Sequence, residues 1–461
     1  MEPFGWIAVA ASLAVACYVT VARRKRLAAT ILQVSKLLHL TFVNEGRGRV
    51  RGSYRGFDVD LRVETRADND NTTYVLHHRL YARDKIPTDV RLVSSADLGR
   101  GSTAEVLATM DADFDRCFSV AGRRLEALAV LDAATRRALI ARLRDVSLLV
   151  AAGALVAVRE RADRDGVSEI VRRFERLVEL AERLSVPRDQ LFDRVAHNAI
   201  ADPLWAVRAE NLDCACGERP GTDAVIDLCR RALDDSHPRV RFIAACHLEG
   251  EGTVVLRELA LNPKERALDP SEARFEDGVP ADVAADAVKA LATRISGPEL
   301  AAVLQSVLQS GRYALAKEQA LEIVRARKVA LPAALVVAVL EASDEVPAEV
   351  VLRALVAIGD GSVTARIASL LPDLRPEDQV AACRALRVIG TVEAVEALRE
   401  LTRGVLRDRE VGAAAEQAIA AIQLRARGEV GRLSVIDGAD AGGLALAEGG
   451  ALAVVDGKDD P

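Results

Sequence analysis

The sequence predicts a mainly α-helical protein with an N-terminal transmembrane helix, a small α+β domain, a right-handed α-solenoid and a disordered tail. Three observations lead to this prediction: an uncharged apolar segment at the N-terminus, alternating apolar spacing in the next part, and a repeated pair of small and aliphatic residues in the second half. The expected boundaries are 3–22 for the anchor, 28–165 for the α+β domain, 166–427 for the solenoid and 428–461 for the tail.

The anchor prediction depends on residues 3–22, which carry no charged side chain and are mostly aliphatic. A segment of this length just spans a hydrocarbon core of about 30 Å. Basic residues occupy positions 23–26, and basic residues are retained on the cytoplasmic side of a membrane. We therefore expect a single-pass anchor in the bacterial inner membrane with the bulk of the chain in the cytoplasm. A cleaved export signal, the alternative, needs its basic residues before the apolar segment.

Composition excludes two further classes of protein. The seven cysteines lack the spacing of a disulfide framework, which agrees with a cytoplasmic location. The formal net charge of −6 on 461 residues gives no basic field, so we expect no nucleic-acid partner.

Residues 28–165 change from helical to alternating spacing, which predicts an α+β domain. Residues 57–63 alternate apolar and charged side chains, as in a strand with one face in water. The other expected strands and helices follow the same two patterns. We expect strands at 74–81, 90–94, 146–150 and 155–158, and helices at 28–39, 125–143 and 167–184.

The second half repeats an alanine with an aliphatic residue four positions later. The pairs are Ala244/Leu248, Ala287/Leu291, Ala320/Val324, Ala354/Ile358, Ala385/Ile389 and Ala418/Ile422. Successive alanines are 43, 33, 34, 31 and 33 residues apart. A fixed period of this size is typical of a solenoid, whose stacked units cannot bury their apolar faces alone. The longest interval contains an acidic insertion, Asn262 to Pro280, which we expect to be a loop.

Each repeat is predicted to be a helical hairpin. In the clearest copy, Pro376 occupies a first helical turn and Gly390 follows the last apolar position. A second apolar set, at residues 395–401, begins the return helix. The alanine allows two helices to approach closely, while the branched residue fills the space between hairpins.

Three segments carry a family resemblance: His237 to Leu248, Pro376 to Gly390 and, more distantly, Asp202 to Arg208. Over roughly residues 190–425 the chain resembles short bacterial HEAT repeats, of the kind also found in phycobilisome-lyase relatives. The resemblance implies a stack of helical hairpins with a binding surface. A bilin-lyase-like activity is the least favoured implication, because no residue can be matched to a chromophore-handling role. Residues 113–122 are similar to a phrase in uncharacterised membrane-tethered bacterial domains.

One cysteine cluster has partial metal-site character: Cys214, Cys216, Cys229 and Cys246, with His237 and His247 nearby in sequence. Zinc sites commonly use cysteine pairs two to four residues apart, and here the second compact pair is missing. Buried structural cysteine is the favoured interpretation. We therefore expect no metal and no cofactor.

Two other polar groups have structural interpretations. His77 and His78 are adjacent in a predicted strand and so point to opposite faces. Asp111, Asp113 and Asp115 lack the glycine and closing glutamate of a calcium loop and are expected to cap a turn. No phosphate loop, nucleophile elbow or zinc-protease helix is found, which favours a non-enzyme.

The tail contains three copies of the phrase Gly-x-Leu-(Ser/Ala)-(Val/Leu)-x-(Asp/Glu), at residues 431–437, 442–448 and 450–456. Residues 428–461 hold seven acidic and two basic side chains, a balance of −5. Such a segment buries too little surface to fold alone. The phrases are interpreted either as recognition peptides or as a solubilising tail.

These observations favour a membrane-anchored, non-catalytic scaffold or adaptor for protein partners. The alternative is a ligand sensor or enzyme whose site lies in the α+β domain. The candidate binding surface is formed by polar positions of the second helices of the repeats: Arg257, Glu258, Gln305, Arg366, Glu396, Arg399 and Glu400.

Overall fold

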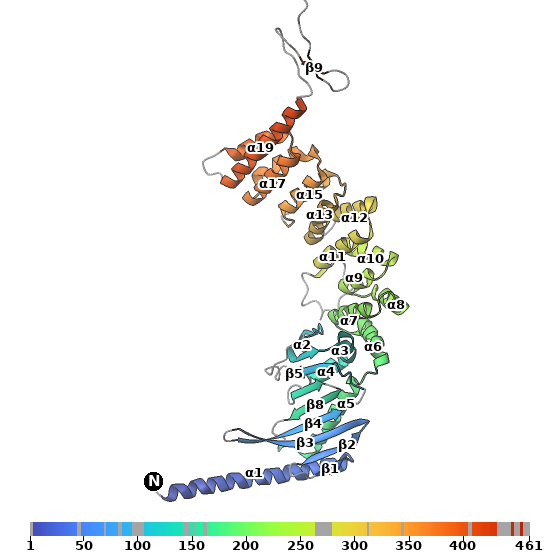
Figure 1. Cartoon of the computed structure of the whole chain (residues 1–461), viewed down its shortest axis with the longest axis vertical. Coiled ribbons are helices and arrows are strands. Elements are labelled where there is room, and N and C mark those ends of the chain that lie inside the picture. Colours follow the sequence, from blue (N-terminus) through green and yellow to red (C-terminus); the bar gives the residue numbers. More distant parts are fainter. Residues whose placement is uncertain are drawn as a thin grey trace, which may run out of the picture. The chain divides into compact units, whose positions relative to one another are not determined.

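The computed structural model is mainly helical and has an antiparallel sheet in its N-terminal part, as predicted (Figure 1). Its described residues are 3–43, 48–68, 71–81, 85–94, 106–141, 147–151, 153–159, 164–262, 279–310, 313–342, 345–403, 408–430, 444–446 and 452–454. The chain divides into two compact units, Met1–Leu248 (unit 1) and Glu249–Pro461 (unit 2).

Unit 1 is built on one antiparallel sheet with the strand order β1-β2-β3-β4-β8-β7-β5-β6. The strands are β1 (Thr41–Val43), β2 (Arg49–Tyr54), β3 (Phe57–Asp68), β4 (Asn71–Tyr81), β5 (Arg91–Ser94), β6 (Phe118–Ala121), β7 (Ser147–Ala151) and β8 (Ala154–Arg159). All strands that were predicted are present. The short β1, β2 and β6 were not predicted, because each is too short or too polar for a clear alternation.

Apolar residues on alternate positions of the strands give the sheet one buried face. Val59 and Leu61 of β3 are buried, while Asp58 is exposed on the other face of the sheet. Helices α1 (Pro3–Leu37) and α5 (Val167–Leu184) cover the buried face. Phe174 of α5 meets the Tyr54 ring edge-on at 5.3 Å between centroids. Helix α5, assigned by sequence to the solenoid, is thus part of the sheet's core.

Helix α1 continues without a break from the predicted anchor into the core of unit 1. Its later residues Leu27, Ile31 and Val34 are buried, and the Tyr74 hydroxyl donates to the Thr20 carbonyl at 2.6 Å. Among the residues that the structure describes, no helix has both the length and the apolar character needed to cross a membrane. The side chains of residues 3–17 lie outside that part, so the anchor at 3–22 stays a prediction.

The predicted helix at 125–143 is two helices, α3 (Arg124–Val130) and α4 (Ala133–Ile140). Asp132 separates them because its carboxylate accepts the Thr135 backbone N–H at 2.7 Å and caps the second helix. A further helix, α2 (Ala112–Cys117), precedes them and was not predicted. Local capping thus overrides a continuous apolar pattern.

The remaining helices of unit 1 pack on the sheet domain rather than forming a separate body. They are α6 (Leu191–Ala201), α7 (Trp205–Glu218), α8 (Asp223–Ala232) and α9 (Pro238–Cys246). Arg136 of α4 joins them to the sheet domain: its guanidinium donates to Asp111 at 2.8 Å and to Asp202, after α6, at 3.0 Å. The division after Leu248 therefore differs from the predicted boundary between 165 and 166.

Unit 2 consists of paired helices in two layers. Its helices are α10 (Gly250–Leu261), α11 (Val279–Arg294), α12 (Gly297–Ser310), α13 (Ala314–Arg327), α14 (Ala333–Ala342), α15 (Ala348–Ile358), α16 (Thr364–Leu370), α17 (Pro376–Ile389), α18 (Val395–Thr402) and α19 (Arg409–Val430). Helices α11, α13, α15, α17 and α19 pack in succession and form the first layer. Helices α10, α12, α14, α16 and α18 pack likewise and form the second layer.

The repeated alanines lie where the first-layer helices touch. Ala287, Ala320, Ala354 and Ala418 are completely buried, and Ala385 is 3% exposed. The predicted boundaries of the clearest repeat are confirmed, because α17 begins at Pro376 and ends at Ile389. Gly359 ends α15 in the left-handed region, at φ 74°, where a side chain would be strained.

Two predicted segments lie mostly beyond the described residues. The insertion at 262–280 is described only at its two ends. In the tail, β9 (Leu444–Leu446) pairs with β10 (Leu452–Val454) as an antiparallel hairpin. These short strands come from the second and third tail phrases, and the other tail residues are outside the description.

Candidate functional site

The predicted binding surface lies on the second layer of unit 2, and its arginines are already paired. Arg257 of α10 pairs with Glu299, and Arg366 of α16 forms a two-point contact with Glu341. Arg399 of α18 contacts Glu396, with 3.5 Å between a guanidinium nitrogen and a carboxylate oxygen. The other predicted positions are Glu258, Gln305 and Glu400, from α10, α12 and α18. They lie in one layer, so the predicted surface stays a prediction.

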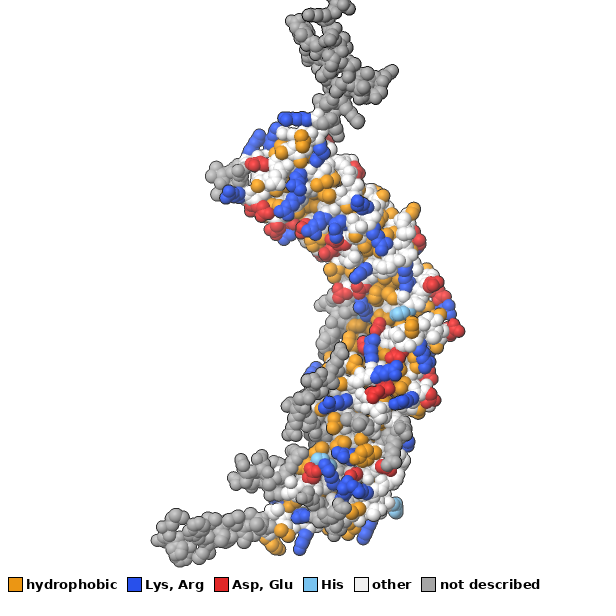
Figure 2. Space-filling model, in the orientation of Figure 1, with side chains coloured by type: hydrophobic (Ala, Val, Ile, Leu, Met, Phe, Trp, Pro, Cys, Tyr) orange, Lys and Arg blue, Asp and Glu red, His pale blue; other side chains and the backbone are white. Residues whose placement is uncertain are grey.

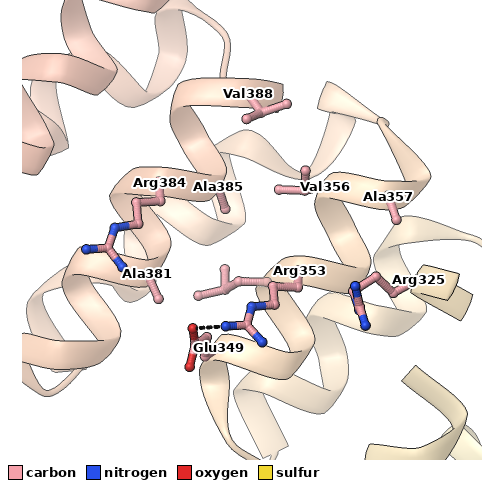
Figure 3. Close-up of a pocket in the computed structure, with 10 residues that line it drawn as sticks. Arg325, Glu349, Arg353, Val356, Ala357, Ala381, Arg384, Ala385 and Val388 are labelled. Atoms are coloured by element: carbon pink, nitrogen blue, oxygen red, sulfur yellow. Dashed lines mark hydrogen bonds and ion pairs between the residues drawn. The ribbon is translucent and has the colours of Figure 1, made fainter. Parts of the chain in front are cut away.

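A groove instead opens on the first layer, between α15 and α17 with α13 at one end (Figure 3). It encloses about 360 Å³. Aliphatic side chains form most of its wall: Leu352, Val356, Ala357, Ala381, Ala385 and Val388. We call this feature the first-layer groove. Val388 is 51% exposed, so an apolar side chain faces water here in the described structure.

Small residues create the first-layer groove. Ala381 and Ala385 lie on the α17 wall, where larger side chains would close the space against α15 (Figure 3). An apolar concavity of this kind gains affinity by burying a partner's aliphatic side chains, at roughly 25 cal/mol per Å² of apolar area. The sequence contained a signal for this groove, because Val388 is an apolar residue outside the repeated pair Ala385/Ile389.

Three arginines stand around the first-layer groove: Arg325, Arg353 and Arg384. Each contacts a glutamate, namely Glu322, Glu349 and Glu410 in that order. These side chains are largely exposed, and exposed ion pairs contribute only about 0–1 kcal/mol. The arginines can therefore exchange their glutamates for acidic groups of a partner.

The surroundings of the groove are mixed in charge. Basic and acidic side chains alternate over the visible face of unit 2, with apolar side chains between them (Figure 2). Within the groove wall itself, three arginines stand against the single carboxylate of Glu349. Glu322 and Glu410, which contact Arg325 and Arg384, balance the other two positive charges.

The metal-candidate cysteines do not converge on a metal site. Cys216 of α7 and Cys229 of α8 lie with their Sγ atoms 3.5 Å apart, and both are buried. Cys214 is also buried, which raises the pKa of its thiol to about 11 and disfavours the thiolate that a metal needs. Cys246 lies at the end of α9. Among the described residues, no group of three or more metal-binding side chains occurs.

The two histidines lie on opposite faces as predicted, although neither is exposed, and of the three aspartates Asp111 caps a helix. His78 packs against Phe174 in the core, while His77 lies on the opposite face at 2.9 Å from Glu64. Burial, followed by the nearby Arg173 and His77, lowers the pKa of His78 to about 3. Asp111 caps α2 by accepting the Phe114 backbone N–H at 3.2 Å.

A second concavity, about 480 Å³, lies on the solvent face of the sheet over β2, β3 and β4. Arg49 donates to Asp60 at 2.7 Å, and this hydrogen bond lowers the pKa of the Asp60 carboxyl. Arg51 and Arg79 also line this concavity, with the Arg79 guanidinium 5.8 Å from the centre of the Tyr81 ring. We call it the sheet-face concavity. Sequence reasoning missed it, because the strands that form it meet only after folding.

Comparison with known proteins adds no relative: no family model, curated protein or solved structure matches the chain.

Proposed function

We propose that this protein is a membrane-anchored scaffold that binds protein partners through the first-layer groove of unit 2. The observation that carries the proposal is an apolar groove surrounded by arginines whose present partners are exposed glutamates. A partner of matching chemistry is a short segment with two or three aliphatic residues next to acidic ones. The stacked helical hairpins support a right-handed HEAT-like solenoid, a class that binds through extended surfaces.

The experiment uses the full-length chain, purified in detergent and offered to a lysate of the source bacterium. The test variants are Val388→Glu, which charges the groove wall, and the double variant Arg353→Glu/Arg384→Glu. The matched control is Arg366→Glu/Arg399→Glu, which reverses two similarly exposed arginines in the second layer. We expect partners whose capture falls at least about tenfold with both test variants and changes little with the control.

Other results would contradict this assignment. Equal loss with the groove variants and the second-layer control would indicate nonspecific capture. Loss with the second-layer control alone would place the binding surface on Arg366 and Arg399, as the sequence predicted. Circular dichroism of each variant shows whether the helices are retained.

Membrane attachment is the second part of the proposal. It is supported by the uncharged residues 3–22, the basic residues that follow, and the unbroken course of α1. Deleting residues 2–17 should release the chain from the membrane fraction while keeping Thr20, which accepts the Tyr74 hydroxyl. A C-terminal reporter that works only in the periplasm should stay silent, and activity would reverse the proposed orientation.

The sheet-face concavity favours a second candidate function, a sensor for small anions. It places Arg49, Arg51 and Arg79 beside the carboxylates of Asp58 and Asp60, so three positive charges stand against two negative ones and an anionic ligand meets a net positive charge. Inorganic phosphate should then raise the unfolding temperature of the parent chain but not of Arg51→Ala/Arg79→Ala. Equal shifts in the two proteins would exclude this site.

A further inference from the structure

The first-layer groove and the acidic tail have complementary chemistry. The groove wall is aliphatic and carries Arg325, Arg353 and Arg384 at its margin. The second and third tail phrases each combine aliphatic residues with a final acid, Glu448 or Asp456. The tail as a whole has a balance of −5, from seven acidic and two basic residues between 428 and 461.

The hairpin of β9 and β10 arranges the aliphatic positions of the tail on one face. Leu444 pairs with Val454, and Leu446 pairs with Leu452. Directly paired residues lie on the same face of a ladder, and so do alternate residues of one strand. These four positions therefore share one face of the hairpin.

The chain connectivity brings the tail to the groove. Arg425 of α19 donates to the carbonyls of Arg387 and Gly390 at 2.6 and 2.7 Å. The C-terminal part of α19 is thereby fixed at the end of α17 that holds Val388. Residues 431–443 connect α19 to the hairpin, and at about 3.3 Å per residue they span up to roughly 40 Å. The link is long enough for the hairpin to return to the groove.

Tethering makes even a weak contact effective. A segment that belongs to the same chain as its binding site meets that site at an effective concentration of about a millimolar. A separate protein must compete with this local concentration, so the tail is the first ligand that the groove meets.

We propose that the hairpin of β9 and β10 binds in the first-layer groove of its own chain and limits access of other partners. This inference rests on the proposed function, because it assigns an occupant to the same groove. Aliphatic positions 444, 446, 452 and 454 enter between α15 and α17, and Glu448 and Asp456 pair with Arg353 and Arg384. A partner with the same chemistry binds by displacing the hairpin.

Photo-crosslinking in the full-length chain tests the inference. A benzophenone amino acid replaces Val388 in the groove or, as a control, Val254 of α10, which is also an exposed valine of unit 2 at 68%. Trypsin cuts after Arg432 and Lys458, so a captured tail is identified by mass spectrometry as the peptide 433–458. We expect the crosslink from position 388 to be at least about tenfold stronger than that from position 254.

Two tail variants establish which contacts are responsible. Leu444→Asp/Leu452→Asp should reduce the crosslink at least about fivefold, because it places charge on the apolar face. Arg353→Glu/Arg384→Glu should also reduce it, and adding Glu448→Arg/Asp456→Arg should restore it. Trypsin also cuts after the two introduced arginines, so in this variant the captured tail is identified as the peptide 433–448 or 449–456. If the crosslink is not restored, the proposed ion pairs of Glu448 and Asp456 with the groove arginines are wrong.

Three results would overturn the inference. They are equal crosslinking from positions 388 and 254, no tail peptide at position 388, or a product with twice the mass of the chain. The last result would assign the groove to the tail of a second copy. Partner capture by the groove is measured separately, so the proposed function can hold when the tail is absent from the groove. A tail crosslink without groove-dependent capture would reject the proposed function instead.

Discussion

Two arginines of unit 1 and two arginines of unit 2 have opposite roles. In unit 1, Arg136 is 1% exposed and holds Asp202, and Arg208 holds Asp235 with both side chains nearly buried. In unit 2, Arg353 and Arg384 lie largely in water and contact equally exposed glutamates. A buried pair cannot lose one partner without leaving an uncompensated charge, whereas an exposed pair is replaced by water at little cost. Arg136 and Arg208 thus fix the structure of unit 1, whereas Arg353 and Arg384 stay available for binding.

The largest expected effect comes from breaking the buried network of unit 1. Arg136→Ala leaves the Asp202 carboxylate, 1% exposed in the native protein, without its cation. We expect the free energy of unfolding to fall by about 3–5 kcal/mol. Trp205 of α7 is a tryptophan of unit 1, and the other tryptophan, Trp6, lies in the proposed anchor, so the change in tryptophan fluorescence during denaturation reports on unit 1 through Trp205.

Arg230→Ala is the matched control for this change. Arg230 of α8 is also in unit 1, but its pair with Asp227 is exposed, and its loss should cost less than about 1 kcal/mol. Similar costs for Arg136→Ala and Arg230→Ala would contradict the distinction between fixed and available arginines.

A smaller effect is expected at the helix contacts of unit 2. Ala320 of α13 is completely buried, and Ala320→Leu should overpack this contact and destabilise unit 2 by about 1–3 kcal/mol. The control is Ala326→Leu, the same change at an exposed alanine of the same helix. Hydrogen exchange of unit 2 peptides, followed by mass spectrometry, compares the two. Equal protection in both variants would show that the repeated alanine is not a packing position.

The remaining effect is a pH dependence that belongs to unit 1 and grows with each pH unit of acidification. His78 stays neutral in the folded chain because its pKa is lowered to about 3, while an unfolded chain protonates it below about pH 6.5. Protonation then favours the unfolded state, so stability falls as pH decreases between these values. The slope is at most about 1.4 kcal/mol per pH unit.

The parent chain and His78→Leu are compared by fluorescence-monitored denaturation across this pH range. The variant should lose less stability on acidification, because it has no imidazole to protonate. Parallel curves would show that His78 is not the source of the slope.

Periodicity in the sequence was enough to locate most elements. The alternation at residues 57–63 predicted β3, and the positions of Pro376 and Gly390 predicted the bounds of α17. These features depend on neighbouring residues only. The break between α3 and α4 was missed because the cap at Asp132 overrides the apolar pattern on both sides.

The sites were harder to predict, because each combines distant segments. The first-layer groove needs α13, α15 and α17, and the sheet-face concavity needs strands β2, β3 and β4. The sequence placed binding on the second helices, since neighbouring repeats display their polar residues side by side. Folding instead pairs Arg366 with Glu341, a residue 25 positions away.

The sequence by itself determined the helical repeats, the alternating strands and the acidic phrases of the tail, because each depends on spacing along the chain. Only the tertiary structure decided that α5 covers the sheet, that Arg136 joins the sheet domain to α6, and that a groove opens beside Val388. Burial and charge pairing depend on which segments meet in space. Local spacing does not determine these contacts between distant segments, since they form when the chain removes its apolar surface from water.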